Sequence, residues 1–283
     1  MVDVIKEVGE ENVVQIITDN APVCKAVGMI IEGLFPKLFW TPCVVHTLNL
    51  ALKNICATKN VEGNGVVYDT RFTYAIVMMK RFKFLKPSLQ SMVISEEWSS
   101  YRANDMGKTQ AIKEFVLNDV WWDKITYILA FTQPIYNMLR ACDTDSPTLH
   151  LVYEWWDTMI EKVKIVIYRQ GEKEVNDTST FYQVVYNILI ARWTKNCTPL
   201  HCTAYSLNPR SNSEEWLQES SNRIPPHENE EIFMERNKCL KKFFTTSEDK
   251  QRAALEYADF SSKSNFFSSF DTIEDMWILD PKS

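Results

Sequence analysis

The chain has little glycine and little proline for its length. Its 283 residues include 7 Gly and 11 Pro, so few positions interrupt regular structure. No apolar run approaches the roughly 18 residues that a membrane-spanning helix needs. Several enzyme signatures are also missing, since there is no Gly-rich phosphate loop, no Gly-x-Ser-x-Gly and no His-Glu-x-x-His. These absences predict an ordered, helix-rich, soluble protein without a phosphate-loop, nucleophile-elbow or zinc-protease motif.

Excess positive charge and a cysteine framework are absent too. The formal net charge is −6 and the isoelectric point is near 5.4, so nucleic-acid binding would have to rest on a local basic patch. The seven cysteines are odd in number and scattered, and no signal peptide is recognisable. We therefore expect reduced thiols and an intracellular protein.

Strand and helix patterns alternate in the first 57 residues. Residues 13–18 are a short β-branched run, which predicts a strand buried on both faces. Asn20 stands where the N-cap of the next helix belongs, and Pro22 lies in its first turn. The apolar positions of this helix recur at helical spacing: Val23, Val27, Ile30 and Leu34.

A second strand and helix follow. Residues 38–45 predict a short strand, and Pro42 starts the next helix. One face of that helix is apolar: Val45, Leu48, Leu52 and Ile55. The polar, Gly-containing stretch 57–66 is then a candidate domain boundary. These residues together have an α/β pattern.

Beyond residue 66 the pattern is almost entirely helical. Long amphipathic segments carry large aromatic side chains at i, i+3 and i, i+4 spacing, which is typical of a helical bundle. A polar loop is expected over 208–231, with two more helices after it. We predict an α+β, mainly α fold with an α/β piece over 1–66, a helical domain over 67–250 and a return segment over 251–283.

Asp19 is the first candidate for chemistry, because it directly follows the predicted strand 13–18. A metal-dependent phosphoryl-transfer site needs carboxylates that converge from separate strands, and a strand end holds such a group rigidly. The alternative is a carboxylate that caps the next helix. Spacing alone favours the capping role.

Two groups of cysteine and histidine could contribute to a metal site. Cys43 and His46 lie one helical turn apart, and Cys197, His201 and Cys202 form a second group. Zinc takes four ligands, so a site of Cys43, His46 and His201 is conceivable but incomplete. The favoured alternative places Cys43 in the core and lets His46 donate to a backbone or carboxylate oxygen.

The strongest basic patch lies at 80–86, where Phe82 and Phe84 separate four cations: Lys80, Arg81, Lys83 and Lys86. The patch could contact phosphates, or it could be a solvated helix face. A weaker patch follows at 239–244. The tryptophan pairs at 121–122 and 155–156 could stack on nucleobases, although core packing is the more usual role of such residues.

The order of several short motifs resembles the hAT transposase superfamily, in its plant branch. The main landmarks are TDN (18–20), LFWTPC (38–43), CVVH (43–46) and LNL (48–50). The resemblance continues through TRF (70–72), SEEWSS (95–100), RWTKNCTPLHCTAYSLNPR (192–210) and DPKS (280–283). It therefore spans nearly the whole chain.

This resemblance implies a ribonuclease-H-like catalytic core interrupted by a helical insertion domain. It also implies an Asp-Asp-Glu triad that binds Mg²⁺ or Mn²⁺ for DNA cutting and strand transfer. By motif position, Asp19 matches the second Asp of the triad, and Cys43 with His46 matches a pair beside the active site. Arg71 matches the Arg of an Arg-Trp pair associated with a flipped base, and Phe72 stands in place of the Trp. The resemblance assigns a domain to each part of the chain: a partial catalytic core to 1–66, the insertion domain to 67–250 and a truncated return to the core to 251–283.

The resemblance also implies missing parts. The first Asp would lie before residue 1 and the Glu after Ser283, so Asp19 is left as one weak metal ligand without partners, and we expect no cofactor. A terminal-repeat-reading zinc finger and a dimerisation region are also missing. We expect a catalytically inactive, transposase-derived nuclear protein that is a monomer or self-associates non-specifically. Weak, non-specific DNA binding would involve Arg71, Phe72 and the four cations of 80–86.

Two alternatives stay open: a fragment of a full-length metal-dependent transposase, and a helical protein-interaction scaffold. The strand at 13–18 would lack a neighbour if the first strand of the core is missing. An unpaired apolar edge of this kind promotes aggregation. We therefore expect 1–66 to be labile to proteases and residues of about 70–250 to be resistant.

Overall fold

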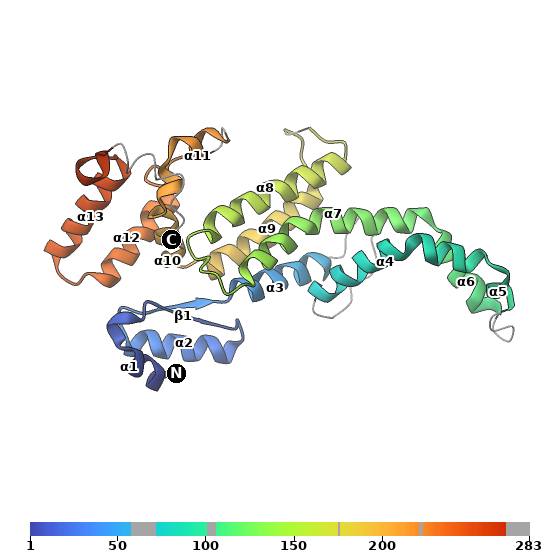
Figure 1. Ribbon diagram of the computed structural model, residues 1–283, viewed down its shortest axis with the longest axis horizontal. Helices are drawn as coiled ribbons and strands as arrows, with labels where there is room; N and C mark the ends of the chain where they lie inside the picture. Colours follow the sequence, from blue (N-terminus) through green and yellow to red (C-terminus); the bar gives the residue numbers. More distant parts are fainter. Residues whose placement is uncertain (58–71, 101–105, 175, 221–222, 270–283) are drawn as a thin grey trace. The chain divides into compact units, whose positions relative to one another are not determined.

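The computed structural model describes the chain except for residues 58–71, 101–105, 175, 221–222 and 270–283 (Figure 1). The described residues form two compact units. Unit 1 takes its residues from Met1–Thr47, Ala141–Thr158 and Ala191–Ser283, and unit 2 from Leu48–Arg140 and Met159–Ile190. A two-stranded sheet and many helices confirm the predicted α+β, mainly α class. The linear domain division at residues 66 and 250 stays a prediction.

Unit 1 contains both strands. Its N-terminal elements are α1 (Val2–Val8), η1 (Glu10–Asn12), β1 (Gln15–Thr18), α2 (Pro22–Leu34), β2 (Phe39–Pro42) and the first turn of α3 (Val44–Ala57). Later segments add the first part of α8 (Val152–Gln170), the end of α9 (Thr180–Asn196), α10 (Pro199–Ser206), η3 (Pro209–Asn212), α11 (Glu214–Gln218), α12 (Glu230–Phe243), α13 (Ser247–Ser261) and η4 (Asn265–Ser268). Both predicted strands form, but β1 spans four residues of 13–18 and β2 only half of 38–45. The expectation that the first strand is buried on both faces is wrong, because Ile17 is 60% exposed.

β1 and β2 are parallel neighbours, and α2 forms the crossover between them. On one face of this sheet, Ile16 packs against a cluster that includes Ile31 of α2. On the other face, Phe39 packs with Leu200 of α10 and Cys239 of α12. Helices thus cover both faces, as a parallel sheet requires.

The apolar spacing of α2 predicted the helix correctly, but it did not predict the buried face. Gly28 and Ile31 are the buried residues of α2. The four regularly spaced side chains are 73%, 39%, 63% and 58% exposed: Val23, Val27, Ile30 and Leu34. They form a second, uncovered stripe along the helix. In α3, by contrast, the predicted positions Leu48, Leu52 and Ile55 are all buried.

The polar loop predicted over 208–231 is partly wrong, because η3 and α11 form within it. Four of its polar side chains are buried and make local hydrogen bonds: Asn208, Ser211, Asn212 and Ser213. Asn208 accepts from the N–H of Arg210, and Ser213 accepts from the N–H of Trp216 at the start of α11. Ser211 donates its hydroxyl to a carbonyl of α10. The polar residues of 208–213 therefore serve local capping, whereas the acidic side chains of α11 are exposed.

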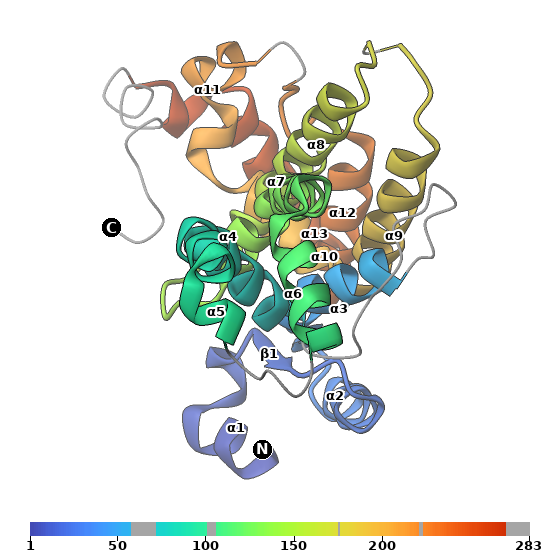
Figure 2. The ribbon, with the colours of Figure 1, turned by 90° about the vertical axis from the view of Figure 1, so that its right-hand side faces the viewer.

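Unit 2 is a helical bundle, as its aromatic spacing predicted. It consists of α4 (Phe72–Ile94), α5 (Glu96–Ser100), α6 (Met106–Leu117) and α7 (Asp119–Cys142) with the remaining parts of α3, α8 and α9. Figures 1 and 2 show α7 and α9 side by side, and Phe181 of α9 contacts Phe131 of α7 with ring centroids 5.4 Å apart. Among the described residues, no helix combines the length and apolarity needed to cross a bilayer.

Candidate functional site

The carboxyl ends of the two strands meet at one edge of the sheet. β1 ends at Thr18 and β2 ends at Pro42, and these two residues are partners in the parallel register. The backbone N–H of Cys43 donates to the carbonyl of Thr18 at 2.9 Å. Asp19 follows β1 at the same edge, and α3 begins just after Cys43. Ligands of open α/β sheets bind at this edge, so it is the candidate site.

The Asp19 carboxylate has two partners. Its Oδ1 accepts a hydrogen bond from the backbone N–H of Ala21 at 3.2 Å, immediately before α2. Its Oδ2 lies 3.4 Å from Nε2 of His46, and the two side chains are 50% and 51% exposed. The bond to Ala21 closes a turn before the helix and does not cap α2, whose first turn receives no side-chain capping bond. The other carboxylate oxygen stays accessible beside His46. The metal-ligand role of Asp19 and the active-site role of Cys43 and His46 stay predictions.

Asn20 does not cap α2, contrary to the sequence expectation. Ala21 is the N-cap residue, and its side chain makes no capping hydrogen bond. The Asn20 amide instead donates to Oγ1 of Thr47 at 2.7 Å and to Oδ1 of Asn196 at 3.4 Å. Thr47 in turn donates to the carbonyl of Cys43 at 3.0 Å. Polar side chains from three segments of unit 1 thus fix the backbone next to Asp19.

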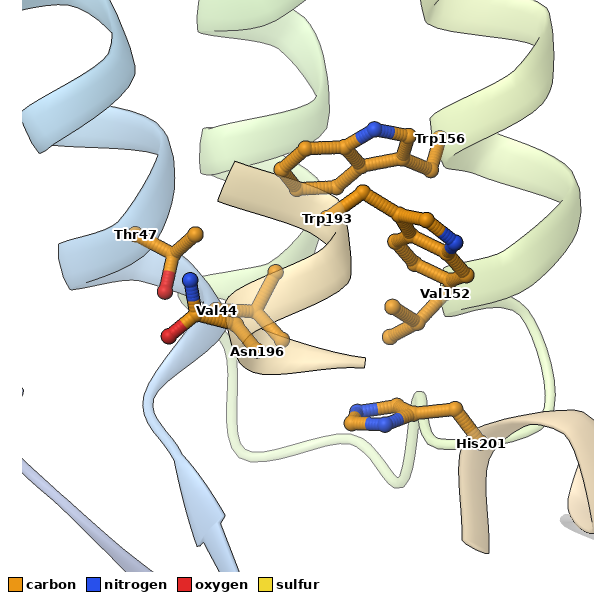
Figure 3. Close-up of a pocket in the computed structure, with 7 residues that line it drawn as sticks. All are labelled: Val44, Thr47, Val152, Trp156, Trp193, Asn196 and His201. Carbon is orange, nitrogen blue, oxygen red and sulfur yellow. The ribbon is translucent and has the colours of Figure 1, made fainter. Parts of the chain in front are cut away.

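A small pocket borders these polar groups (Figure 3). Its lining residues are Val44, Thr47, Val152, Trp156, Trp193, Asn196 and His201. The free volume is about 10 Å³, which is about the room that one water molecule needs. The two indole rings of the lining have centroids 5.3 Å apart. This pocket is therefore too small for a nucleobase, and its tryptophans act as packing residues.

His201 is a buried structural histidine. It is 2% exposed, and its Nδ1 accepts the backbone N–H of Thr198 at 3.1 Å at the start of α10. Burial lowers the pKa of His201 to about 4, because the apolar surroundings disfavour the charged imidazole. The conceivable zinc site of Cys43, His46 and His201 does not form, since no three metal-ligating side chains gather in the described part of the chain.

Cys197 and Cys202 are close but not bonded to each other. Their Sγ atoms are 3.8 Å apart, and both thiols are free. The hydrogen bond to Cys202, together with burial, holds the pKa of the Cys197 thiol well above its usual range. Reactive cysteines need a lowered pKa, so this pair is part of the core of unit 1.

The basic patch of α4 separates into engaged and exposed cations. The Lys80 ammonium lies 4.1 Å from the ring centroid of Tyr136. The Lys86 ammonium pairs with Asp119 at 3.0 Å. Arg81 and Lys83 are exposed on the surface of unit 2. The two remaining DNA-contact predictions cannot be placed in the same way, because Arg71 lies outside the described residues and the Phe72 side chain is not described.

One tryptophan of each adjacent pair belongs to a core, and Trp121 and Trp155 are half-buried. Trp122 is 2% exposed and donates its indole N–H to the carbonyl of Val116 at 2.7 Å. Trp156 is 4% exposed. Stacking on nucleobases would require an accessible ring face. The rings of Trp122 and Trp156 have no accessible face.

Sequence reasoning missed Thr47 and Asn196. The only available signal for Thr47 was its place between His46 and Leu48, as a hydroxyl within an apolar helix. Asn196 gave no signal, because its partner Asn20 is 176 residues away in the chain. Contacts of this range depend on the fold and not on local spacing.

Comparison with known proteins gives a family match to the N-terminal part of the chain. A domain of unknown function, DUF659, matches residues 1–64, which include both strands and the site residues Asp19, Cys43 and His46. This domain is found in hAT-like transposase-related proteins. No curated protein and no solved structure matches the chain.

Proposed function

We propose that this chain is an hAT-transposase-derived nuclear protein that binds DNA weakly through exposed cations and does not cut it. The DUF659 match supports the transposase origin, because it covers the strand ends that present Asp19. The observation that carries the proposal is the pairing of Asp19 with a single metal-ligating side chain, His46. The strand ends would then be a ribonuclease-H-like core that has kept its second Asp position.

Cutting DNA by this family's chemistry needs a divalent-metal centre held by several carboxylates. One carboxylate beside one imidazole does not fit such a centre. In the ranges that the structure describes, no group of three or more His, Cys, Asp or Glu side chains could complete it. These residues therefore support no metal-dependent step.

DNA binding would depend on α4. Arg81 and Lys83 are exposed, although the Arg81 guanidinium also lies 5.2 Å from the ring centroid of Phe84 on the same helix. Phosphate contacts need no sequence match. Lys80 and Lys86 already contact an aromatic ring or a carboxylate of unit 2, so they would contribute less. The contact would be electrostatic and non-specific in a chain of net charge −6.

Fluorescence anisotropy with labelled duplex DNA at rising salt tests the proposal. Neutralised phosphates release counterions, so binding should weaken as salt rises. The double variant Arg81→Ala, Lys83→Ala should reduce the slope of log affinity against log salt by about 2. Lys124→Ala with Lys162→Ala is the matched control, since both lysines are exposed in unit 2. If the wild type does not bind DNA at low salt, or if both double variants lose the same amount of DNA affinity, α4 is not the DNA-binding element.

A further inference from the structure

The outer edge of β2 is closed to further strands. The backbone N–H of Trp40 points away from β1 and donates to the Glu32 carboxylate at 3.0 Å. Pro42, the next outward residue, has no N–H to offer. Lys242 of α12 donates to the same Glu32 oxygen at 2.8 Å and covers this side. Any growth of the sheet must therefore occur beside β1.

Within the described part of the chain, no segment pairs with the outer edge of β1. The N–H of Phe39 donates to the carbonyl of Val14, which fixes the alternation of the parallel ladder. The backbone groups of Gln15 and Ile17 consequently point away from β2, and no described residue pairs with them. The Ile17 side chain is 60% exposed. Residues 13–18 carry no charge, so this edge lacks the protection that natural edge strands usually have.

The uncovered stripe of α2 lies on the same side as this open edge. Glu32 marks the flank of α2 that faces the outer edge of β2. At about 100° per residue, each stripe residue lies roughly 140–180° around the helix from Glu32: Val23, Val27, Ile30 and Leu34. The stripe therefore faces the space beside β1, where it would cover one face of an added strand.

We propose that a second copy of this chain fills this space through a twofold axis perpendicular to the sheet. The β1 strands of the two copies would pair antiparallel and would join the two β1–β2 pairs into one four-stranded sheet. The two α2 helices would lie on the same face with their stripes in contact. Strands are spaced about 4.8 Å apart, so a helix over each β1–β2 pair places the two helix axes about 10 Å apart. That separation is the usual packing distance of helices.

The chemistry of the surface favours a second copy over a charged partner. Neither the α2 stripe nor residues 13–18 contain a charged side chain, so an acidic or basic segment would find no complement there. The stripe positions are separated by four, three and four residues, a spacing that suits packing against another helix. A twofold contact covers the open edge and the stripe of both copies at once.

The mass of the full-length chain in solution, by light scattering across a concentration series, tests the proposal. The wild type should pass from the 33.0 kDa monomer to a dimer of twice that mass. Ile30→Lys should raise the dissociation constant of the dimer by roughly 100-fold, because the contact between the two α2 helices would bury two added ammonium groups. Met29→Lys is the matched control, since Met29 is 60% and Ile30 63% exposed on opposite sides of the outward face of α2. It should dissociate as the wild type does.

Hydrogen exchange of the Gln15 and Ile17 amides gives a second readout on the same samples. These amides should be protected in the dimer and should exchange quickly at concentrations low enough for the chain to be monomeric. The variant Ile17→Pro should not dimerise, although its circular dichroism spectrum should show a folded chain. A monomer at every concentration would overturn the proposal, as would a dimer that Ile30→Lys leaves intact. Protection of these amides in the monomer would show that another segment of the chain fills the space. Aggregates of undefined mass would show that the β1 edge associates without a defined partner geometry. Amide protection in the monomer and aggregation would each reject the twofold contact.

Discussion

The indole ring of Trp40 lies so close to Gly28 that no side chain fits between β2 and α2. A Cβ atom on Gly28 would stand 2.3 Å from Cγ of the ring. The ring itself is held in place, because its N–H donates to Oγ1 of Thr18 at 2.7 Å. This contact sets the distance between the helix and the sheet, and therefore the position of both strand ends.

The variant Gly28→Ala should destabilise unit 1, because the fixed ring and the new methyl group cannot both keep their places. Overpacking of this kind costs about 1–3 kcal/mol. Gly33→Ala is a control on the same helix, since nothing lies within 4 Å of a Cβ there. It should be neutral or stabilising by up to about 1 kcal/mol. Urea unfolding followed by circular dichroism measures both, and equal stability of the two variants would contradict the contact.

The Glu32 carboxylate joins the strand edge to α12, so its removal should also weaken unit 1. Glu32→Ala leaves the Trp40 N–H and the Lys242 ammonium without this acceptor. Part-buried hydrogen bonds to a charged group are worth about 1.5–3 kcal/mol, and solvent will reduce this at 25–30% exposure. A double-mutant cycle with Lys242→Met isolates the pair. A coupling energy of zero would show that the ion pair contributes nothing to stability.

The N-terminal fold could be predicted from sequence because its signals are local. The β-branched run at 13–18 and the proline at position 22 mark a strand and a helix start without reference to the rest of the chain. The role of the α2 stripe could not be predicted, because hydrophobic periodicity shows that a face is apolar but not whether anything covers it. Asn20 illustrates the same limit. Its partner Asn196 is distant in sequence, so local capping rules pointed to the wrong role.

The stability of unit 1 should depend on pH through His201. The pKa of His201 is about 4 in the folded chain, against the 6.5 of an ordinary histidine, so the unfolded chain binds the proton more readily. Stability is therefore fully present above about pH 6.5 and should fall by roughly 3 kcal/mol as pH drops to about 4. Denaturant unfolding between pH 7 and pH 4 measures this slope.

Two histidine variants separate His201 from other titrating groups. His201→Gln should lower stability at pH 7 but remove most of the slope between pH 6.5 and pH 4. His227→Gln serves as the control, because the His227 side chain is 38% exposed. Its unfolding should follow the wild-type pH dependence. A wild-type slope that survives in His201→Gln would exclude His201 as the responsible group.

Limited proteolysis should leave the N-terminal segment associated with the later part of unit 1. The sequence predicted that 1–66 would be labile, but three contacts tie 1–47 to distant residues. Asn20 bonds to Asn196, Glu32 bonds to Lys242, and the ring of Phe39 lies 5.5 Å from that of Phe243.

A trypsin time course with mass spectrometry should therefore show fragments of 1–47 and of 191–261 eluting together from a native sizing column. Early and separate loss of 1–47 would support the original expectation of a labile segment. The Glu32→Ala variant should release the N-terminal fragment sooner than the wild type.

Cleavage of labelled hairpin and nicked duplex DNA in Mn²⁺, with the wild type and Asp19→Asn side by side, tests the central claim most directly. The pairing of Asp19 with a single imidazole predicts that neither protein forms product above the rate without protein. Both proteins should nevertheless bind the same DNA with equal, salt-sensitive affinity, because the α4 cations are unchanged. Product that forms with the wild type and disappears with Asp19→Asn would contradict the account and make this chain an active nuclease.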